Sequence, residues 1–98
     1  MSTSRLSLDT SPDGHLLASG VIDAHTADSL GTALGERSAD TTLDLNAVDF
    51  IDSSGLRVIV SAHQRFADAG AQLTIVNLSE AADRLFEITG LKDHLHLS

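Results

Sequence analysis

The chain has 98 residues, with six basic against fourteen acidic side chains and a net charge of −8 at pH 7. An acidic protein of this size repels nucleic-acid phosphates and anionic lipid headgroups, so neither nucleic acid nor a membrane surface is an expected partner. Because the sequence contains no cysteine, disulfides, thiolate nucleophiles and sulfur-bound zinc are excluded.

Length and hydropathy predict one small globular domain. Hydrophobic residues make up 42% of the chain and aromatic residues only 3%, so Leu, Val, Ile and Ala must form the core. A chain this short is expected to fold as a single domain over residues 1–98. The first five residues lack the apolar stretch of a signal peptide, and no run approaches the ~20 apolar residues of a membrane span. We therefore expect a cytoplasmic protein.

The first predicted elements are a β-hairpin and a short helix. Residues 5–8 alternate in polarity, a Ser-Pro-Asp-Gly turn follows, and residues 16–20 run back as a second strand. Apolar residues at i, i+3 and i+7 then predict a helix over 27–35. Either Asp23 or Thr26 is suited to cap its N-terminus.

The rest of the chain alternates between strand and helix. Periodicity predicts a strand over 41–46, a helix over 54–69, a strand over 72–76, a helix over 79–90 and a strand over 94–97. The first of these strands is expected to end near Asn46, where the alternation breaks. The order β-β-α-β-α-β-α-β predicts an α/β fold, with a mixed sheet of four or five strands and helices packed against it. The expected core comprises Leu43, Leu45, Leu56, Ile59, Val60, Leu73, Ile75, Leu85 and Phe86.

Most sequence signatures of an enzyme are missing. There is no Gly-rich nucleotide loop, and the only lysine, Lys92, lies in a predicted turn. The pair Ser53-Ser54 lacks the glycine that precedes a nucleophile elbow by two positions. A hydrolase would therefore depend on a serine, scattered histidines and several aspartates alone. We expect no catalytic site and no cofactor.

Metal and phospho-receiver sites are also weakly supported. His94 and His96 share one face of a predicted strand, but two imidazoles seldom hold zinc, so surface or capping histidines are expected. Asp44, Asp49 and Asp52 cluster near a strand end, as carboxylates do in receiver domains, yet the acidic pair and lysine that a receiver needs are absent. We expect no metal site.

One segment, Asp-Ser-Ser-Gly at residues 52–55, joins an apolar run to a strongly periodic helix. A helix cap explains part of it, since Asp52 or Ser53 can accept hydrogen bonds from the first turn and Gly55 permits close packing. A cap leaves a second hydroxyl group unexplained. A phosphate here would meet unpaired amides and the positive end of the helix dipole, so a serine is chemically suited to modification.

Four segments together carry a family resemblance. They are Gly-Val-Ile-Asp at 20–23, the stretch from Leu43 to Leu56 that ends in Asp-Ser-Ser-Gly-Leu, Ala-Gly-Ala-Gln-Leu-Thr-Ile-Val at 69–76, and Leu-Phe-Glu-Ile-Thr-Gly-Leu at 85–91. In this order they resemble the STAS domain of bacterial anti-sigma factor antagonists, over about Arg5 to Leu97. Arg57 departs from the family pattern, in which a small residue is common at this position.

The resemblance implies a non-enzymatic switch protein. The serine matching Ser53 would be phosphorylated by a partner that is both an anti-sigma factor and an ATP-dependent serine kinase, with Ser54 as the alternative acceptor. Only the unmodified form would bind that partner and free the sigma factor, and a serine phosphatase would reset the switch. A phosphate adds about −1.5 to −2 charges beside Asp52, which opposes docking onto an acidic or nucleotide-loaded surface.

The expected partner surface combines two loops, because adjacent strands that end at the same edge bring the following loops together. The resemblance places partner contacts in the same region, and the residues predicted to bind the partner are Asp23, His25, Thr26, Asp52, Ser53, Gly55 and Leu56. These residues would otherwise serve only as helix caps. The alternative function is a STAS protein-interaction module of a stress-signalling or transport assembly, in which the serine is not used.

Overall fold

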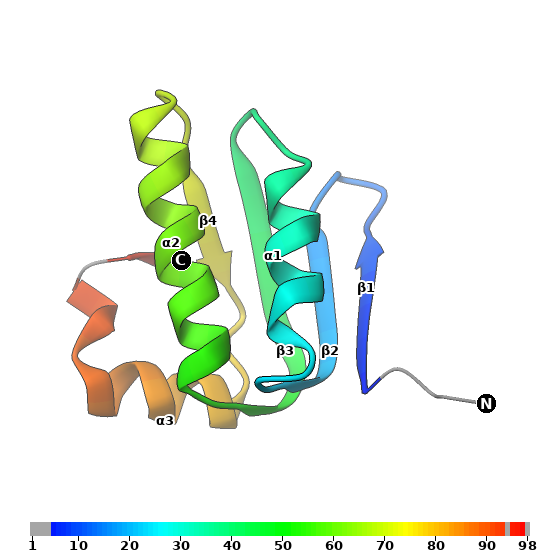
Figure 1. Ribbon diagram of the computed structural model, residues 1–98, viewed down its shortest axis with the longest axis vertical. Helices are drawn as coiled ribbons and strands as arrows, with labels where there is room; N and C mark the ends of the chain where they lie inside the picture. The colour runs from blue at the N-terminus through cyan, green and yellow to red at the C-terminus, as the bar shows by residue number, and fades with distance from the viewer. Residues whose placement is uncertain (1–4, 94, 98) are drawn as a thin grey trace.

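A computed structural model describes residues 5–93 and 95–97, which form a mixed sheet covered by helices (Figure 1). The elements are β1 (Leu6–Thr10), β2 (Leu16–Ile22), α1 (Ala27–Gly35), β3 (Thr41–Ile51), α2 (Ser53–Asp68), β4 (Leu73–Val76), α3 (Glu80–Thr89), the 3-10 helix η1 (Leu91–Asp93) and β5 (His96–Leu97). The predicted α/β class and order of elements are confirmed. His94, the predicted start of the last strand, lies outside the described residues.

The five strands lie in the order β1-β2-β3-β4-β5. β1 pairs with β2 in antiparallel orientation, and each later neighbour is parallel, so the sheet is mixed as predicted. Parallel neighbours require crossover connections, which α1, α2 and α3 provide. The carboxyl ends of β2, β3 and β4 therefore meet at the same edge of the sheet.

β3 is longer than the sequence pattern predicts. Its pairing with β2 shifts register twice, between Leu17 and Ser19 and between Gly20 and Val21, and each shift places one additional β3 residue opposite β2. Such β-bulges bend a strand without ending it. They keep Leu45, Val48 and Ile51 buried while the residues between them are exposed. The prediction that this strand ends near Asn46 is therefore wrong, because a bulge also interrupts the alternation.

The core lies between the sheet and the two helices α1 and α2, which pack side by side on one face (Figure 1). Seven of the nine predicted core residues are buried: Leu43, Leu45, Leu56, Ile59, Leu73, Ile75 and Phe86. Val60 is 37% exposed, because it lies one residue beyond the face of α2 on which Ile59 contacts the core. Leu85 is partly buried and packs against the core, while Phe86 takes the fully buried position on α3. The core prediction is therefore wrong for Val60.

The termini of the later helices follow the predicted signals. The hydroxyl of Ser79 accepts the amide of Ala82 at 3.2 Å and so caps α3. Gly70 and Gly90 both adopt the left-handed conformation that ends α2 and α3, with φ of 77° and 74°. Over residues 5–93 and 95–97, none of the helices has the length and apolar character needed to cross a membrane.

Candidate functional site

Two loops meet where β2 and β3 end. Ile22 and Ile51, the last residues of these strands, are paired in the sheet, and the amide of Asp52 donates to the carbonyl of Ile22 at 3.1 Å. The loop that begins at Asp23 therefore lies beside the turn that begins α2, at the lower edge of the sheet in Figure 1. The juxtaposition expected from the strand order is present.

The first loop is held by its own side chains. One carboxylate oxygen of Asp23 accepts the amides of His25 at 2.9 Å and Thr26 at 3.2 Å. The Thr26 hydroxyl accepts the Asp23 amide at 2.9 Å and donates to the carbonyl of Val21 at 2.8 Å. The other carboxylate oxygen of Asp23 lies 2.7 Å from the guanidinium of Arg5. Thr26 occupies the N-cap position of α1, and Asp23 supplies the carboxylate that fixes the turn before it.

The pKa of Asp23 reflects these contacts. Burial, which leaves 13% of the side chain exposed, opposes ionisation and would raise the pKa. The amide of His25, the Arg5 guanidinium and the amide of Thr26 outweigh it, so the pKa lies below the ordinary value of 3.8. Asp23 is therefore ionised at neutral pH.

The second loop presents a serine at the start of α2. Asp52 is the N-cap, and one of its carboxylate oxygens accepts the amide of Ser54 at 2.8 Å and that of Gly55 at 3.4 Å. Ser53 is exposed, and its hydroxyl makes no hydrogen bond within residues 5–93 and 95–97. Ser54 is half-buried. Ser53 is thus the more accessible of the two hydroxyl groups.

Three of the predicted partner-binding residues lie inside the protein. A Cβ atom on Gly55 would overlap the side chain of Ile22 and come within 3.0 Å of Ile51, so α2 begins directly on the ends of β2 and β3. Leu56 is 6% exposed and Thr26 8% exposed. In the isolated chain these three residues are buried beneath the two loops, whereas the side chains of His25 and Ser53 are exposed.

Two features beside this site could not be recognised in the sequence: the ion-pair partner of Asp23 and an apolar groove. No pattern pointed to Arg5 as the ion-pair partner of Asp23. Phe50 is 49% exposed and Ile88 on α3 is 74% exposed, and they line an apolar groove of about 230 Å³ that also includes Ile51. Phe50 lies in an apolar run beyond the predicted end of the strand, so the sequence pattern assigned its side chain to neither face of the sheet.

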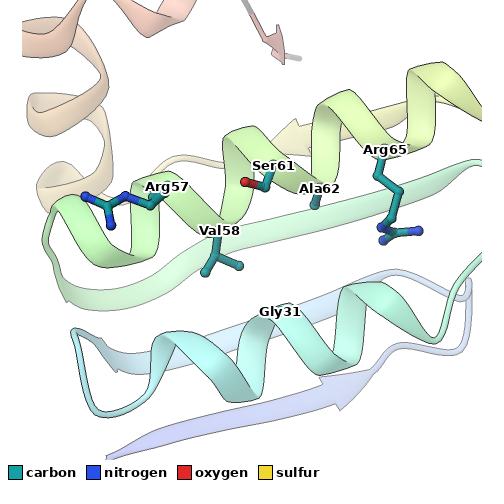
Figure 2. A pocket seen from close by; sticks show the side chains of 6 residues that line it. All are labelled: Gly31, Arg57, Val58, Ser61, Ala62 and Arg65. Carbon is teal, nitrogen blue, oxygen red and sulfur yellow. The ribbon is translucent and has the colours of Figure 1, made fainter.

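A second groove, of about 300 Å³, lies between α1 and α2 (Figure 2). Its lining residues are Gly31, Arg57, Val58, Ser61, Ala62 and Arg65. The Arg65 guanidinium donates to the carbonyl of Leu34 at 2.8 Å and lies 4.8 Å from the centre of the Phe66 ring. Arg57 is exposed and makes no hydrogen bond or ion pair with any residue that the structure describes.

Comparisons with known proteins identify the family. The STAS domain model matches residues 10–98. An anti-sigma-B factor antagonist of Bacillus subtilis (strain 168) is 40% identical over 82 residues, which cover 81% of this chain and 75% of that protein. The crystal structure of an anti-sigma factor antagonist from Mycobacterium paratuberculosis matches with a TM-score of 0.77 and 26% identity, over 94% of this chain and 82% of that one.

The fold is also shared with a protein solved in a modified state. The phosphorylated form of the Bacillus cell fate determinant SpoIIAA matches with a TM-score of 0.68 at 14% identity, over 95% of this chain and 90% of that one. With a family model that spans nearly the whole described chain and a close relative named as an anti-sigma factor antagonist, this protein belongs to the STAS domain family.

Proposed function

We propose that this protein is an anti-sigma factor antagonist controlled by phosphorylation of Ser53. The unmodified form binds an anti-sigma factor that is also a serine kinase, and this binding releases a sigma factor. Phosphorylation by the same partner switches binding off, and a serine phosphatase restores it. The names of the relatives support the antagonist function. The proposal assigns the protein to the cytoplasm and to action by binding, without a catalytic site, cofactor or metal of its own.

The exposed hydroxyl of Ser53 is the single observation that carries the proposal. It lies at the first position of α2, beside the N-cap Asp52, and has no hydrogen bond to lose among the described residues. A kinase can therefore reach it without unfolding α2, and a phosphate can be added without disturbing the core. The chemistry of the site thus fits a switch that changes charge and leaves the fold unchanged.

The surface around Ser53 suggests how the phosphate opposes binding. The carboxylates of Asp23 and Asp52 follow the paired ends of β2 and β3, so this edge already carries negative charge. A phosphate adds about −1.5 to −2 more at pH 7. Burying that charge against a partner removes its hydration without supplying a new counter-ion. The unmodified surface, with exposed His25 and Phe50 beside it, has no such cost.

The modified serine can be identified directly. The wild-type chain and the variants Ser53→Ala and Ser54→Ala are incubated with ATP and the anti-sigma factor kinase of the source organism, and the phosphopeptides are mapped by mass spectrometry. We expect modification in wild type and Ser54→Ala and none in Ser53→Ala. Modification that persists in Ser53→Ala and disappears in Ser54→Ala would move the site to Ser54. Stable binding with no modification in any of the three would instead support an interaction module without a switch.

A further inference from the structure

A phosphate on Ser53 finds few free amides at the start of α2. The Asp52 carboxylate already accepts the amides of Ser54 and Gly55, and the carbonyl of Asp52 accepts the amide of Leu56 at 3.1 Å. The expectation that the phosphate would meet unpaired amides is therefore wrong for Ser54, Gly55 and Leu56, because Asp52 already accepts their amides. A counter-ion for the phosphate has to come from a side chain.

Arg57 has the position and the freedom to be that counter-ion. It lies four residues after Ser53 on α2, and side chains at i and i+4 are neighbours on a helix surface. Long helical side chains point back toward the helix N-terminus. Figure 2 shows the Arg57 guanidinium extended along α2 in that direction. It is exposed and has no ion pair or hydrogen bond within the described part of the chain.

We propose that Arg57 is the counter-ion of the phosphate on Ser53, an inference that rests on the proposed function. An anionic residue four positions before a cationic one is the favourable orientation on a helix. A guanidinium can donate two parallel hydrogen bonds to phosphate oxygens, and such charge-assisted bonds are stronger than neutral ones. Phosphorylation would then add negative charge at the partner surface and at the same time withdraw a free positive charge from it.

Two other arginines, Arg5 and Arg65, already have partners within the protein. Arg5 lies 2.7 Å from the Asp23 carboxylate. Arg65 donates to the carbonyl of Leu34 and lies eight residues beyond Arg57, about 12 Å further along the helix axis. That separation exceeds the Debye length of about 8 Å at physiological salt, so Arg65 contributes little to the field at Ser53. Arg57 is the arginine on α2 that is both close and unpaired.

The test uses protein that carries phosphoserine at position 53, incorporated during translation, so it does not depend on any kinase. The second pKa of the phosphate, ordinarily about 6, is measured by a phosphorus-31 NMR titration in the parent and in Arg57→Gln, Arg57→Lys and Arg65→Gln. If Arg57 binds the phosphate, Arg57→Gln raises this pKa by roughly 0.3 to 0.7 units. Arg57→Lys retains part of the effect. Arg65→Gln, the same change on the same helix, shifts the pKa by less than about 0.1 units.

The inference is overturned if Arg57→Gln has the same phosphate pKa as the parent. In that case the titration of Arg5→Gln shows whether Arg5 holds the phosphate instead, since the rise would then appear in Arg5→Gln. Because phosphoserine is built in, a kinase that fails to modify Ser53 would refute the proposed function and leave the titration of the Ser53–Arg57 pair interpretable.

Discussion

Gly55 and Gly31 are both helical glycines, but they have very different surroundings. A Cβ atom on Gly55 would overlap Ile22, whereas the nearest atom to a Cβ on Gly31 is a methyl carbon of Val58 at 3.4 Å. We therefore expect Gly55→Ala to lower the free energy of unfolding by about 1–3 kcal/mol through overpacking. Gly31→Ala should raise it by up to about 1 kcal/mol through better helix propensity. Urea unfolding of both variants tests this, and equal effects would contradict the close packing inferred at Gly55.

Asp52 and Ser53 are neighbours with different structural importance. Because the Asp52 carboxylate accepts two amides of the first turn of α2, Asp52→Ala should cost about 0.5–2 kcal/mol of stability. Ser53→Ala should change stability by less than about 0.5 kcal/mol, since its hydroxyl is exposed. Thermal or urea unfolding of the two variants separates these roles. A larger loss in Ser53→Ala would show that the serine, rather than the aspartate, is the cap.

The contacts of the Asp23 carboxylate with the amide of His25 and the guanidinium of Arg5 predict a pH dependence. The folded pKa of Asp23 is lowered from 3.8, so the folded state favours the ionised carboxylate. The stability from this ionisation is fully present above the unfolded pKa and is lost as the pH falls through the folded value. Asp23→Asn should therefore be less stable than wild type at pH 7, and the difference should shrink below about pH 4. A difference in unfolding free energy that stays constant or grows on acidification would contradict this account.

At the scale of elements, the two faces of α2 differ in their contribution to stability. Ile59 is fully buried, whereas Val60 is 37% exposed. Ile59→Ala is expected to cost about 2–5 kcal/mol, which threatens a domain of this size. Val60→Ala should cost much less, because little buried surface is lost. Urea melts of the pair test which face of α2 contacts the core, and a loss below 1 kcal/mol in Ile59→Ala would show that the assignment is wrong.

The elements also show why sequence patterns predict some features and miss others. Local signals such as Ser79 before α3 and Gly90 after it depend on a few neighbouring residues, and the structure confirms both. The bulges of β3 depend on its pairing with β2, which is distant in sequence. A rule based on strict alternation therefore ends the strand at Asn46 and does not include residues 47–51, which continue it.

At the scale of the whole molecule, topology gathers the site at one edge of the sheet. Parallel pairing of β2 and β3 places the loops after Ile22 and Ile51 side by side, and this much follows from the order of elements. The partner of Asp23 could not be predicted, because Arg5 reaches it across the antiparallel pair of β1 and β2. Whether Arg57 has an ion-pair partner likewise depends on where the fold places the acidic side chains, and a sequence pattern does not show this.

The central claim is that phosphorylation of Ser53 controls binding to the anti-sigma factor kinase. The most direct test compares the affinity of the purified kinase for the unmodified chain and for the chain with phosphoserine at position 53, with Ser53→Ala as the control. Arg57 offsets only part of the phosphate charge, and burying the remainder at an interface costs about 2–5 kcal/mol, so binding should weaken roughly 30-fold to several-thousand-fold. Ser53→Ala should bind like the unmodified chain. Equal affinity of the modified and unmodified chains would contradict the claim.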